Sequence, residues 1–451
     1  MSAVFRALLA CTLLLLGACA GPAARPDLKR LYAVSTDTPT QPPVVLVHGV
    51  LGARLRDRSS GREVWPGSLA KLAFSDFRDL ALPPDGRADS FEPSGLFDAA
   101  AGRDFYGAVV RTLVEAGGYA PGRIGEDPGA QRKRVYVFLY DWRQDNAASA
   151  AALDAYIDAI RRDHHDPALK VDLVAHSNGG LVSRYFLRYG ARDVLGGNDF
   201  VVDHAGASKV RRLVLLGTTN FGSVRALMGL IDGVPVGFGR VPPEVLASFP
   251  SSYQLFPHAL NDWLLSARGE PIERDLYDIG LWRRFQWGIF DPAVRARIAR
   301  EHADAPAYLA ALEQRMAAAL ERARRFTWSL SVDEGDPPVK PVLLGGDCTL
   351  TPARLVVEEH AGDSVLRLMP GDIRAPVPGI DYDRLMLEPG DGAVTKASLL
   401  ARDSLDPARP RHRWSHFAID YAIFLCEAHD RLTGNPSFQD NLLHALLSVD
   451  R

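Results

Sequence analysis

Ser177 stands in a segment, Val-Asp-Leu-Val-Ala-His-Ser-Asn-Gly-Gly at positions 171–180, whose pattern is typical of nucleophilic catalysis. A strand-like apolar run leads directly into a sharp turn and then a helix, and such a strained turn holds a serine hydroxyl above the edge of a sheet. Strand and helix pack closely only if the residues two before and two after the serine are tiny, as Ala175 and Gly179 are. Ala175 takes the place of the usual glycine and adds one methyl group. We predict that Ser177 is a nucleophile; a plain Asn-Gly-Gly turn is the alternative.

An oxyanion hole needs backbone N–H groups aimed at the position where negative charge develops. One donor is expected from the residue after the nucleophile, here Asn178, and the other from the loop after the first core strand. That loop reads Val-His-Gly-Val-Leu-Gly at 47–52, and its two glycines let the backbone approach a substrate closely. We therefore predict the N–H groups of Val50 and Asn178 as the oxyanion donors. A simple turn at the end of the strand is the alternative explanation for the His-Gly pair.

A serine nucleophile also needs a base and an acid, and in hydrolases of this topology they follow the serine in the order acid, then histidine. Asp391 lies in Pro-Gly-Asp-Gly-Ala-Val, where flanking glycines let the chain turn sharply around one carboxylate. Four histidines follow it: His412, His416, His429 and His444. We choose His416 as the base, because a loop can present it just before a closing helix expected over Phe417–Leu432, which contains His429. Asp391 would orient the imidazole and stabilise its cation; an exposed Asp-Gly turn and a surface histidine are the alternatives.

These groups need a framework, and strand-like and helix-like segments alternate along much of the chain. Apolar runs indicate strands at Val44–Val47, Val135–Leu139, Val171–Ala175 and Val210–Leu216. Helical spacing occurs at Phe105–Ala116, Ala148–Arg162 and Gly180–Tyr189. Such alternation is typical of βαβ units and a buried parallel sheet. We predict an α/β fold, a mostly parallel sheet with helices on both faces.

The alternation stops after Ser223. Residues 224–339 contain several helix-like pieces, including Ala305–Arg324, and few strand-like runs. Val342–Leu344 indicates that the sheet resumes, and Leu355–Glu358 with Val365–Leu368 suggests a hairpin. We therefore expect a core over residues 44–223, a helical cap inserted at 224–339, and the rest of the core over 340–451.

The cap is rich in aromatic residues, with nine between Phe249 and Phe290 in a stretch of 42. Aromatic side chains bury well, so this density is explained by a core within the cap. It would also suit an apolar, concave trough for an acyl chain. We take Phe249, Tyr253 and Phe256, together with Trp142, as candidate substrate-binding residues, and a lid at this position could gate access at a bilayer.

The N-terminus has the features of a targeting segment. Residues 1–18 carry one cation, Arg6, and a short apolar stretch from Ala7 to Leu16, which is typical of a secretory signal. It ends in Leu-Gly-Ala-Cys, which resembles a bacterial lipobox in which Cys19 is lipidated; an ordinary signal peptide with a chance cysteine is the alternative. Residues 19–43 would then be a tether. Because Ala20 rather than aspartate follows Cys19, we expect an outer-membrane lipoprotein facing the periplasm.

The amino-acid composition limits the kinds of partner and cofactor that this protein can be expected to bind. Hydrophobic residues make up 47% and charged residues 24%, which excludes a disordered chain or a rod. The formal net charge of −3 argues against a nucleic-acid partner, which would require a basic face. No cluster has metal-ligand spacing, so no metal or cofactor is expected. Cys348 and Cys426 could pair in an oxidising compartment or remain separate thiols.

Taken together, the motifs resemble those of the lecithin:cholesterol acyltransferase family, which includes lysosomal phospholipases and phospholipid:diacylglycerol acyltransferases. Residues 175–180 resemble the family's A-H-S-M-G-G elbow, and residues 140–143 match its Y-D-W-R motif. Residues 249–257 resemble its cap motif, 390–394 its G-D-G-T-V acid, and 216–223 a strand end common to lipases. The resemblance spans residues 44 to about 420 and implies an α/β-hydrolase fold. His48-Gly49 departs from the family's usual Pro-Gly, and its disulfides do not match Cys348 and Cys426.

The sequence therefore predicts a lipid-anchored serine α/β-hydrolase of the bacterial envelope, acting on a phospholipid or other acyl lipid. Ser177, His416 and Asp391 would transfer an acyl group to water or to an alcohol through an acyl-enzyme. Two alternatives remain: a periplasmic esterase for soluble substrates, and a non-catalytic lipid-binding lipoprotein with a hydrolase fold. The sequence leaves head group, acceptor, chain length and oligomeric state open.

Overall fold

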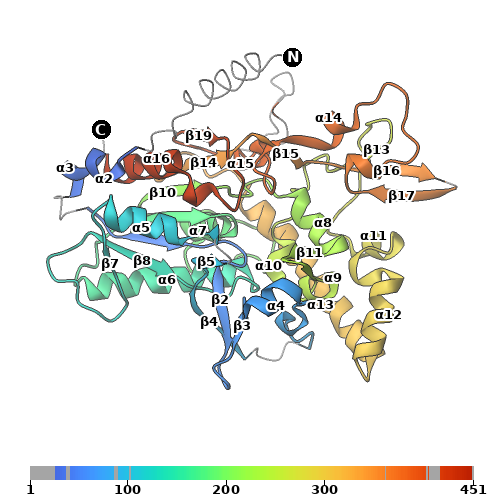
Figure 1. The fold of residues 1–451 in the computed structure, drawn as a ribbon, viewed down its shortest axis with the longest axis horizontal. Helices are drawn as coiled ribbons and strands as arrows, with labels where there is room; N and C mark the ends of the chain where they lie inside the picture. The colour runs from blue at the N-terminus through green and yellow to red at the C-terminus, as the bar shows by residue number, and fades with distance from the viewer. Residues whose placement is uncertain are drawn as a thin grey trace, which may run out of the picture.

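A seven-stranded, all-parallel sheet lies at the centre of the computed structural model, in the order β19-β14-β10-β9-β1-β8-β7 (Figure 1). The structure describes residues 26–36, 41–85, 90–100, 103–360, 362–402, 405 and 417–448. In chain order the strands are β1 (Val44–Val47), β7 (Ala120–Pro121), β8 (Arg134–Phe138), β9 (Val171–His176), β10 (Val210–Leu216), β14 (Val342–Gly346) and β19 (Ala422–Leu425).

Helices cover both faces of this sheet, which is why its strands are apolar at nearly every position. Alternate residues of a strand point to opposite faces. Val45 and Val47 of β1 join a core with α6 (Asn146–Asp163) and α7 (Asn178–Tyr189). Val44 and Leu46 join a second core with α5 (Gly107–Glu115) and α16 (Pro436–Leu447) on the other face. The parallel sheet with helices on both faces, predicted from the sequence, is confirmed.

The end of the chain differs from its prediction. Instead of a closing helix over Phe417–Leu432, the structure has strand β19, a loop, and the 3₁₀ helix η5 (Leu432–Gly434). The helix that closes the chain is α16, which begins at Pro436 behind Asn435, whose side chain accepts the N–H groups of Ser437 and Phe438. A short apolar run such as Ala422–Leu425 fits a strand or one helical turn equally well, so periodicity alone misassigned it.

Between β1 and α5 the chain makes an excursion for which the sequence pattern predicted no elements. Its three-stranded sheet has the order β3-β2-β4. The excursion contains β2 (Ala53–Asp57), β3 (Glu63–Trp65), α4 (Leu69–Phe74), η1 (Arg78–Leu80), β4 (Phe91–Leu96), β5 (Ala99–Ala100) and β6 (Arg103–Asp104). In Figure 1 this small sheet lies below the central one, and α4 lies beside the helices that follow β10 in the chain.

Between β10 and β14 the chain forms a mainly helical cap, to the right of the central sheet in Figure 1. Its own apolar core includes Leu227, Trp282 and Leu320. Its elements are α8 (Val224–Asp232), β11 (Val234–Val236), β12 (Gly239–Val241), α9 (Pro243–Leu246), α10 (Pro250–Tyr253), β13 (Leu264–Ser266), α11 (Ile279–Arg284), η3 (Gly288–Phe290), α12 (Pro292–Glu301) and α13 (Ala305–Ser329). Among the described residues, none of the helices has both the length and the apolar character needed to cross a membrane.

A third excursion separates β14 from β19. The hairpin expected there is formed by β16 (Leu355–His360) and β17 (Asp363–Arg367), which pair antiparallel, and β13 of the cap joins it in parallel. The remaining elements are β15 (Thr349–Pro352), η4 (Pro370–Asp372), α14 (Tyr382–Met386), β18 (Leu387–Gly390) and α15 (Lys396–Leu399), with η2 (Ala207–Lys209) before β10 and α2 (Leu28–Leu31) and α3 (Ala33–Thr36) near the N-terminus.

Candidate active site

The turn that carries Ser177 is a strained nucleophile elbow. Ser177 has φ 53° and ψ −124°, a conformation that residues with a side chain rarely adopt, and α7 begins at the next residue. Its N–H donates to the carbonyl of Leu216 on β10 at 2.8 Å. A Cβ on Gly179 would lie 2.4 Å from the carbonyl oxygen of His48, and one on Gly180 would lie 2.0 Å from Thr218 Oγ1. The elbow therefore needs both glycines, whereas Ala175 is accommodated in full burial.

Asp391 follows β18 and is held in one orientation by the backbone. Its Oδ1 accepts the N–H groups of Ala393 at 3.0 Å and Val394 at 2.7 Å. Gly392 has a φ of 93°, which explains the glycine after the carboxylate. The side chain is only 2% exposed, so its second oxygen can serve a buried partner.

That partner is His429, whose Nδ1 lies 2.8 Å from Asp391 Oδ2. The sequence-based choice, His416, lies outside the described residues. The histidine that the structure brings to the predicted acid is therefore not the predicted one. The backbone reinforces the pairing, because His429 N–H donates to the carbonyl of Asp391 at 2.9 Å.

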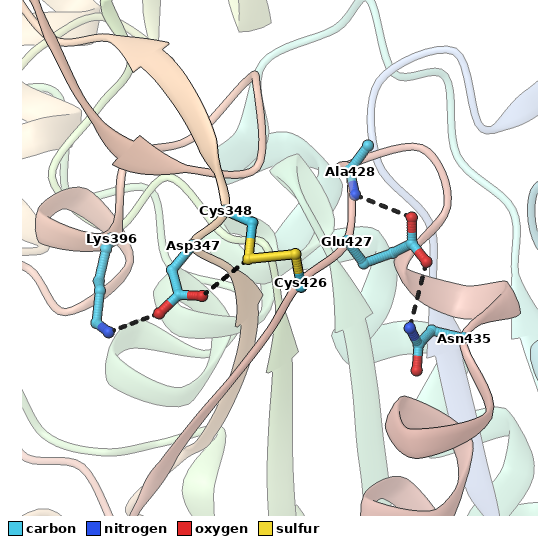
Figure 2. The surroundings of a disulfide bond; sticks show 7 residues. All are labelled: Asp347, Cys348, Lys396, Cys426, Glu427, Ala428 and Asn435. Atoms are coloured by element: carbon cyan, nitrogen blue, oxygen red, sulfur yellow. Dashed lines mark hydrogen bonds and ion pairs between the residues drawn. A yellow bond between two sulfur atoms is a disulfide. The ribbon is translucent and has the colours of Figure 1, made fainter. Parts of the chain in front are cut away.

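His429 was passed over because it was expected inside a helix, whereas it stands on the loop after β19. A disulfide fixes the start of that loop: Cys348, just beyond β14, is bonded to Cys426, three residues before the histidine (Figure 2). The question that the sequence left open is thus answered in favour of pairing. Glu427 extends the anchorage, accepting from the N–H of Ala428 at 3.1 Å and from Asn435 Nδ2 at 3.2 Å.

The pair has the electrostatics of an acid that supports a base. Burial opposes charge on His429, but the charge and hydrogen bond of Asp391 outweigh it and raise the pKa of His429 above its usual value. Burial would raise the pKa of Asp391, but His429 and the two backbone N–H groups overcome this and keep that pKa below its usual value. Asp391 is therefore a carboxylate at neutral pH, and its charge favours the imidazolium form of His429.

The loop with Val50 lies directly against the elbow. A Cβ on Gly49 would come within 2.7 Å of Ser177 Cβ, so only glycine permits this approach. Val50 and Ser177 line the same cavity. Within the part of the chain that the structure describes, neither the Val50 N–H nor the Asn178 N–H has a hydrogen-bond acceptor assigned. Both groups are therefore available to a ligand, and their role as oxyanion donors stays a prediction.

Ser177 and His429 open onto a cavity of about 680 Å³. Trp65, Leu72 and Phe97 of the first excursion and Pro235 and Val236 of the cap supply much of its apolar wall. Polar side chains of the wall lie near the serine and the histidine: Tyr106, His176, Asp430 and Thr433. The volume and the apolar walls suit an acyl chain.

The four aromatic residues proposed to bind substrate do not line this cavity. Trp142 and Phe249 pack edge to face, with ring centroids 5.8 Å apart, inside the core of the sheet. Tyr253 and Phe256 lie in the core of the cap, and each is fully buried. Their role in substrate binding stays a prediction that this cavity does not support, because the aromatic residues pack in buried cores, whereas the cavity wall comes largely from the excursion after β1.

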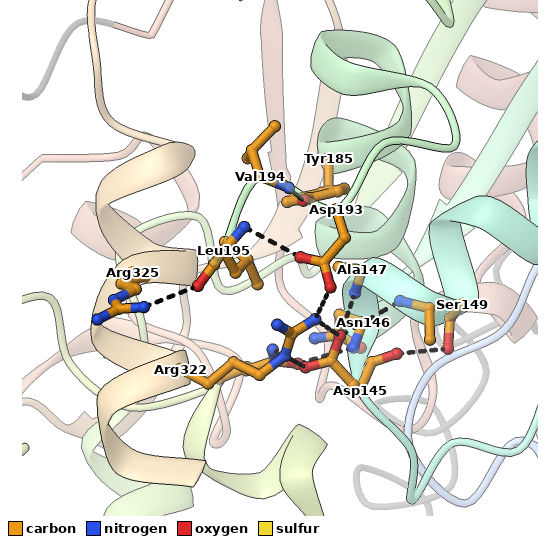
Figure 3. Close-up of polar contacts among 12 residues, drawn as sticks. Asp145, Asn146, Ala147, Ser149, Tyr185, Asp193, Val194, Leu195, Arg322 and Arg325 are labelled. Atoms are coloured by element: carbon orange, nitrogen blue, oxygen red, sulfur yellow. Dashed lines mark hydrogen bonds and ion pairs between the residues drawn. The ribbon is translucent and has the colours of Figure 1, made fainter. Parts of the chain in front are cut away.

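Arg322 joins the cap to Asp145, just before α6, and to Asp193, just after α7 (Figure 3). Arg322 of α13 makes two hydrogen bonds with Asp145, at 2.7 and 2.9 Å, and a third with Asp193 at 2.8 Å. Gln254 of the cap donates to Asp145 Oδ2 and accepts the N–H of Asn146, which begins α6. Asn146 and Asn178 then exchange two amide hydrogen bonds, at 2.9 and 2.8 Å. A continuous polar chain thus joins the cap to the residue after the nucleophile.

Comparison with known proteins agrees with this architecture. The model of the lecithin:cholesterol acyltransferase family matches residues 125–274, a segment with the Y-D-W-R motif, the elbow with Ser177 and the first part of the cap. The family resemblance predicted from the motifs is confirmed over that segment, while Asp391 and His429 lie beyond it. None of the curated proteins matches the chain.

Similar solved structures include the crystal structure of the Tle4-Tli4 complex, at 14% identity and a TM-score of 0.54, covering 90% of this chain and 98% of that one. Lipase 1 from Pelosinus fermentans has 13% identity and a TM-score of 0.38, covering 91% of this chain and 100% of that one. EstA from Clostridium botulinum has 14% identity and a TM-score of 0.36, covering 95% of this chain and 92% of that one. At 14% identity, the likeness to the structure with a TM-score of 0.54 concerns the fold alone. The parallel sheet with helices on both faces, together with the family match over residues 125–274, agrees with the α/β-hydrolase fold predicted from the sequence.

Proposed function

We propose that this chain, which matches the lecithin:cholesterol acyltransferase family over residues 125–274, is a serine-dependent acyl-transfer enzyme for lipid esters. The broader assignment, an ester hydrolase or acyltransferase of the α/β-hydrolase type, follows from the fold and the family match. One observation carries the finer proposal: the strained Ser177 and the Asp391-bound His429 open onto one apolar cavity. The catalytic set is Ser177, His429 and Asp391.

The proposed reaction has two displacements. Ser177 Oγ attacks the ester carbonyl while His429 Nε2 takes the serine proton, because Nδ1 is occupied by Asp391. The Val50 and Asn178 N–H groups bind the oxyanion. When the ester C–O bond breaks, His429 returns the proton to the departing alcohol and the acyl group stays on Ser177. Water or a second alcohol then attacks the acyl-enzyme by the same route in reverse, which releases a free acid or a new ester and restores the serine.

A lipid substrate is supported by the surface next to the cavity. Leu72 of α4 and Gly237 of the cap turn both line the cavity, and beside them three apolar side chains point to solvent. These are Leu69, Phe74 and Phe238, which are 71%, 76% and 87% exposed. The rings of Phe74 and Phe238 stack with centroids 5.9 Å apart. Exposed apolar groups gathered in this way are typical of a surface that meets a lipid phase.

The first test uses vesicles of labelled phospholipid, with and without a long-chain alcohol, and measures free fatty acid and new ester. The wild type should turn over, and Ser177→Ala should lose about 10⁴-fold or more of the rate. New ester would identify an acyltransferase, and free acid alone a phospholipase. Turnover of short soluble esters without vesicle preference would indicate a soluble-substrate esterase. No turnover and no labelling of Ser177 by a fluorophosphonate would contradict the enzyme proposal.

A second test separates the lipid surface from the chemistry. Phe74→Ser with Phe238→Ser should weaken binding to phospholipid vesicles and lower the vesicle rate by about 10²-fold or more, since each exposed aromatic ring contributes roughly 1.5–3 kcal/mol when buried. Hydrolysis of a short soluble ester should stay unchanged. Val201→Ser is the matched control, because Val201 is also exposed and does not line the cavity.

We also propose the envelope location and the lipid anchor on Cys19, a residue outside the described part of the chain. The support is the Leu-Gly-Ala-Cys segment after an apolar stretch. Mass spectrometry of the mature protein should find an acylated Cys19 at the new N-terminus, recovered with outer membranes. Recovery of unacylated protein from the periplasm would contradict the anchor without affecting the proposed reaction.

A further inference from the structure

We infer that Tyr106 and Tyr140 are positioning residues that lock the two halves of the oxyanion hole together. The inference rests on the proposed function, because it concerns the groups that would stabilise the oxyanion. One half is the loop His48-Gly49-Val50, and the other is the elbow that carries Ser177. Each tyrosine hydroxyl forms hydrogen bonds with both halves at once.

Tyr140 provides the first link. Its hydroxyl donates to the carbonyl of His48 at 2.8 Å and accepts from Asn178 Nδ2 at 3.3 Å. Its ring stacks on the His48 ring with centroids 4.3 Å apart and planes 9° apart. Asn178 is also held by its exchange of two hydrogen bonds with Asn146. The residue after the nucleophile is thereby fixed to the oxyanion loop.

Tyr106 provides the second link, on the other side of Ser177. The N–H of Gly49 donates to the Tyr106 oxygen at 2.8 Å, so the single proton of that hydroxyl is free to go to His176 Nδ1, also at 2.8 Å. Burial lowers the pKa of His176 to about 3, so the imidazole that shares this hydrogen bond is neutral. The residues before and after Ser177 are thus each joined to the loop through one tyrosine hydroxyl.

Further hydrogen bonds around His48, beside the two hydroxyl links, orient the Val50 N–H. The Tyr140 N–H donates to His48 Nε2 at 3.3 Å, so His48 carries its proton on Nδ1 and donates it to the carbonyl of Gly49 at 2.8 Å. The N–H of Gly52 donates to that carbonyl as well, at 3.1 Å. A trans peptide is planar, so its carbonyl and its N–H point in opposite directions. Fixing the Gly49 carbonyl therefore fixes the direction of the Val50 N–H.

Burial makes these links effective. Tyr106 and Tyr140 are each 4% exposed, so water does not compete strongly for their hydroxyl groups. Loss of either link would let the loop and the elbow shift relative to each other by fractions of an ångström. Misplacement by about 1 Å lowers a rate by about 10²-fold, and loss of one oxyanion donor by about 10²–10³-fold.

The test measures kcat and KM on a short soluble ester for Tyr106→Phe, Tyr140→Phe and the double variant. Each single variant should lose about tenfold in kcat with KM nearly unchanged, and the double variant about 10²-fold or more. Binding of a boronic acid, whose adduct with serine mimics the oxyanion, should weaken in parallel. The pH at which the rate rises should not move, because neither tyrosine contacts His429 or Asp391. His176, which Tyr106 contacts and whose ring centroid lies 4.7 Å from that of His429, has its pKa lowered to about 3 and stays neutral over this pH range.

A buried tyrosine, Tyr119, and a partly buried one, Tyr156, are the matched controls. Tyr119→Phe removes a hydroxyl that has no hydrogen-bond partner among the described residues, and Tyr156→Phe removes one that donates to the carbonyl of Val137 on β8. Rates are divided by the fraction of protein that a fluorophosphonate labels at completion, which corrects for misfolded protein. Equal kcat in the test and control variants, or a rise in KM alone, would overturn the inference. An unlabelled, inactive wild type would instead refute the proposed function.

Discussion

Replacing His429 tests the correction that the structure made to the sequence-based site. Among the described residues bonded to Asp391, the imidazole of His429 is the only basic side chain, and it lines the same cavity as Ser177. We expect His429→Gln to lower kcat on a soluble ester by about 10⁴–10⁶-fold, which corresponds to about 5.5–8 kcal/mol of lost transition-state stabilisation. His416→Gln should retain the wild-type rate within about twofold.

Glutamine is preferred to alanine as the replacement because removal of the imidazole would leave the Asp391 carboxylate without its side-chain hydrogen-bond partner. Asp391 is a buried carboxylate, and an unpaired buried acceptor costs about 1–3 kcal/mol of stability, and more when it is charged. The glutamine amide can still donate a hydrogen bond toward Asp391 Oδ2, and Oδ1 keeps its two backbone donors. Thermal unfolding should therefore change little while the rate collapses.

The assay combines ester hydrolysis with the rate of fluorophosphonate labelling of Ser177, since both require the serine proton to be removed. His444→Gln, a change on α16, controls for the loss of a histidine elsewhere. Loss of activity in His416→Gln together with a retained rate in His429→Gln would refute the assignment. It would mean that the Asp391–His429 pair is structural.

Three further predictions follow from the same geometry. Asp391 raises the pKa of His429 against the effect of burial, so kcat/KM should rise with pH through an inflection above 6.5. In Asp391→Asn that inflection should move to lower pH, and kcat should fall by about 10⁴-fold. Replacing both Cys348 and Cys426 by serine opens a loop with a sequence separation of 78 residues, and denaturant titration should show a loss of about 4 kcal/mol in the free energy of unfolding. The kcat should fall as well, because the loop that carries His429 is no longer held at its start. Gly180→Ala places a Cβ 2.0 Å from Thr218 Oγ1, so the free energy of unfolding should fall by about 1–3 kcal/mol or the protein should fail to fold.

Much of the framework was predictable because the local signals were strong and agreed. The strands at Val44–Val47 and Val210–Leu216 have the predicted bounds, since continuous β-branched and leucine-rich runs are typical of strands buried on both faces. The elbow was recognisable because its tiny residues must lie at fixed offsets from Ser177. The turn around Asp391 was recognisable because glycines flank a single carboxylate.

The cavity wall was not predictable, for a different reason. Residues such as Trp65 and Leu72 carry no local sign that they line a cavity, because lining depends on which distant segments meet. The turn at Gly237 illustrates this: a Cβ there would lie 2.3 Å from the carbonyl oxygen of Leu72, so the cap and the first excursion come together across more than 160 residues. The high density of aromatic residues in the cap reflects the packing of buried cores and gives no indication of which residues line the cavity.

The sequence by itself determined the local chemistry: a serine on a strained turn, an aspartate between glycines and a parallel sheet to carry them. Those features depend on residues within a few positions of one another, where backbone sterics and hydrophobic periodicity act directly. Only the tertiary structure decided which histidine meets Asp391, that Cys348 bonds to Cys426, and which side chains enclose the cavity. Each of these choices joins segments that are distant along the chain, and the packing of β14, β18 and β19 selects the partner.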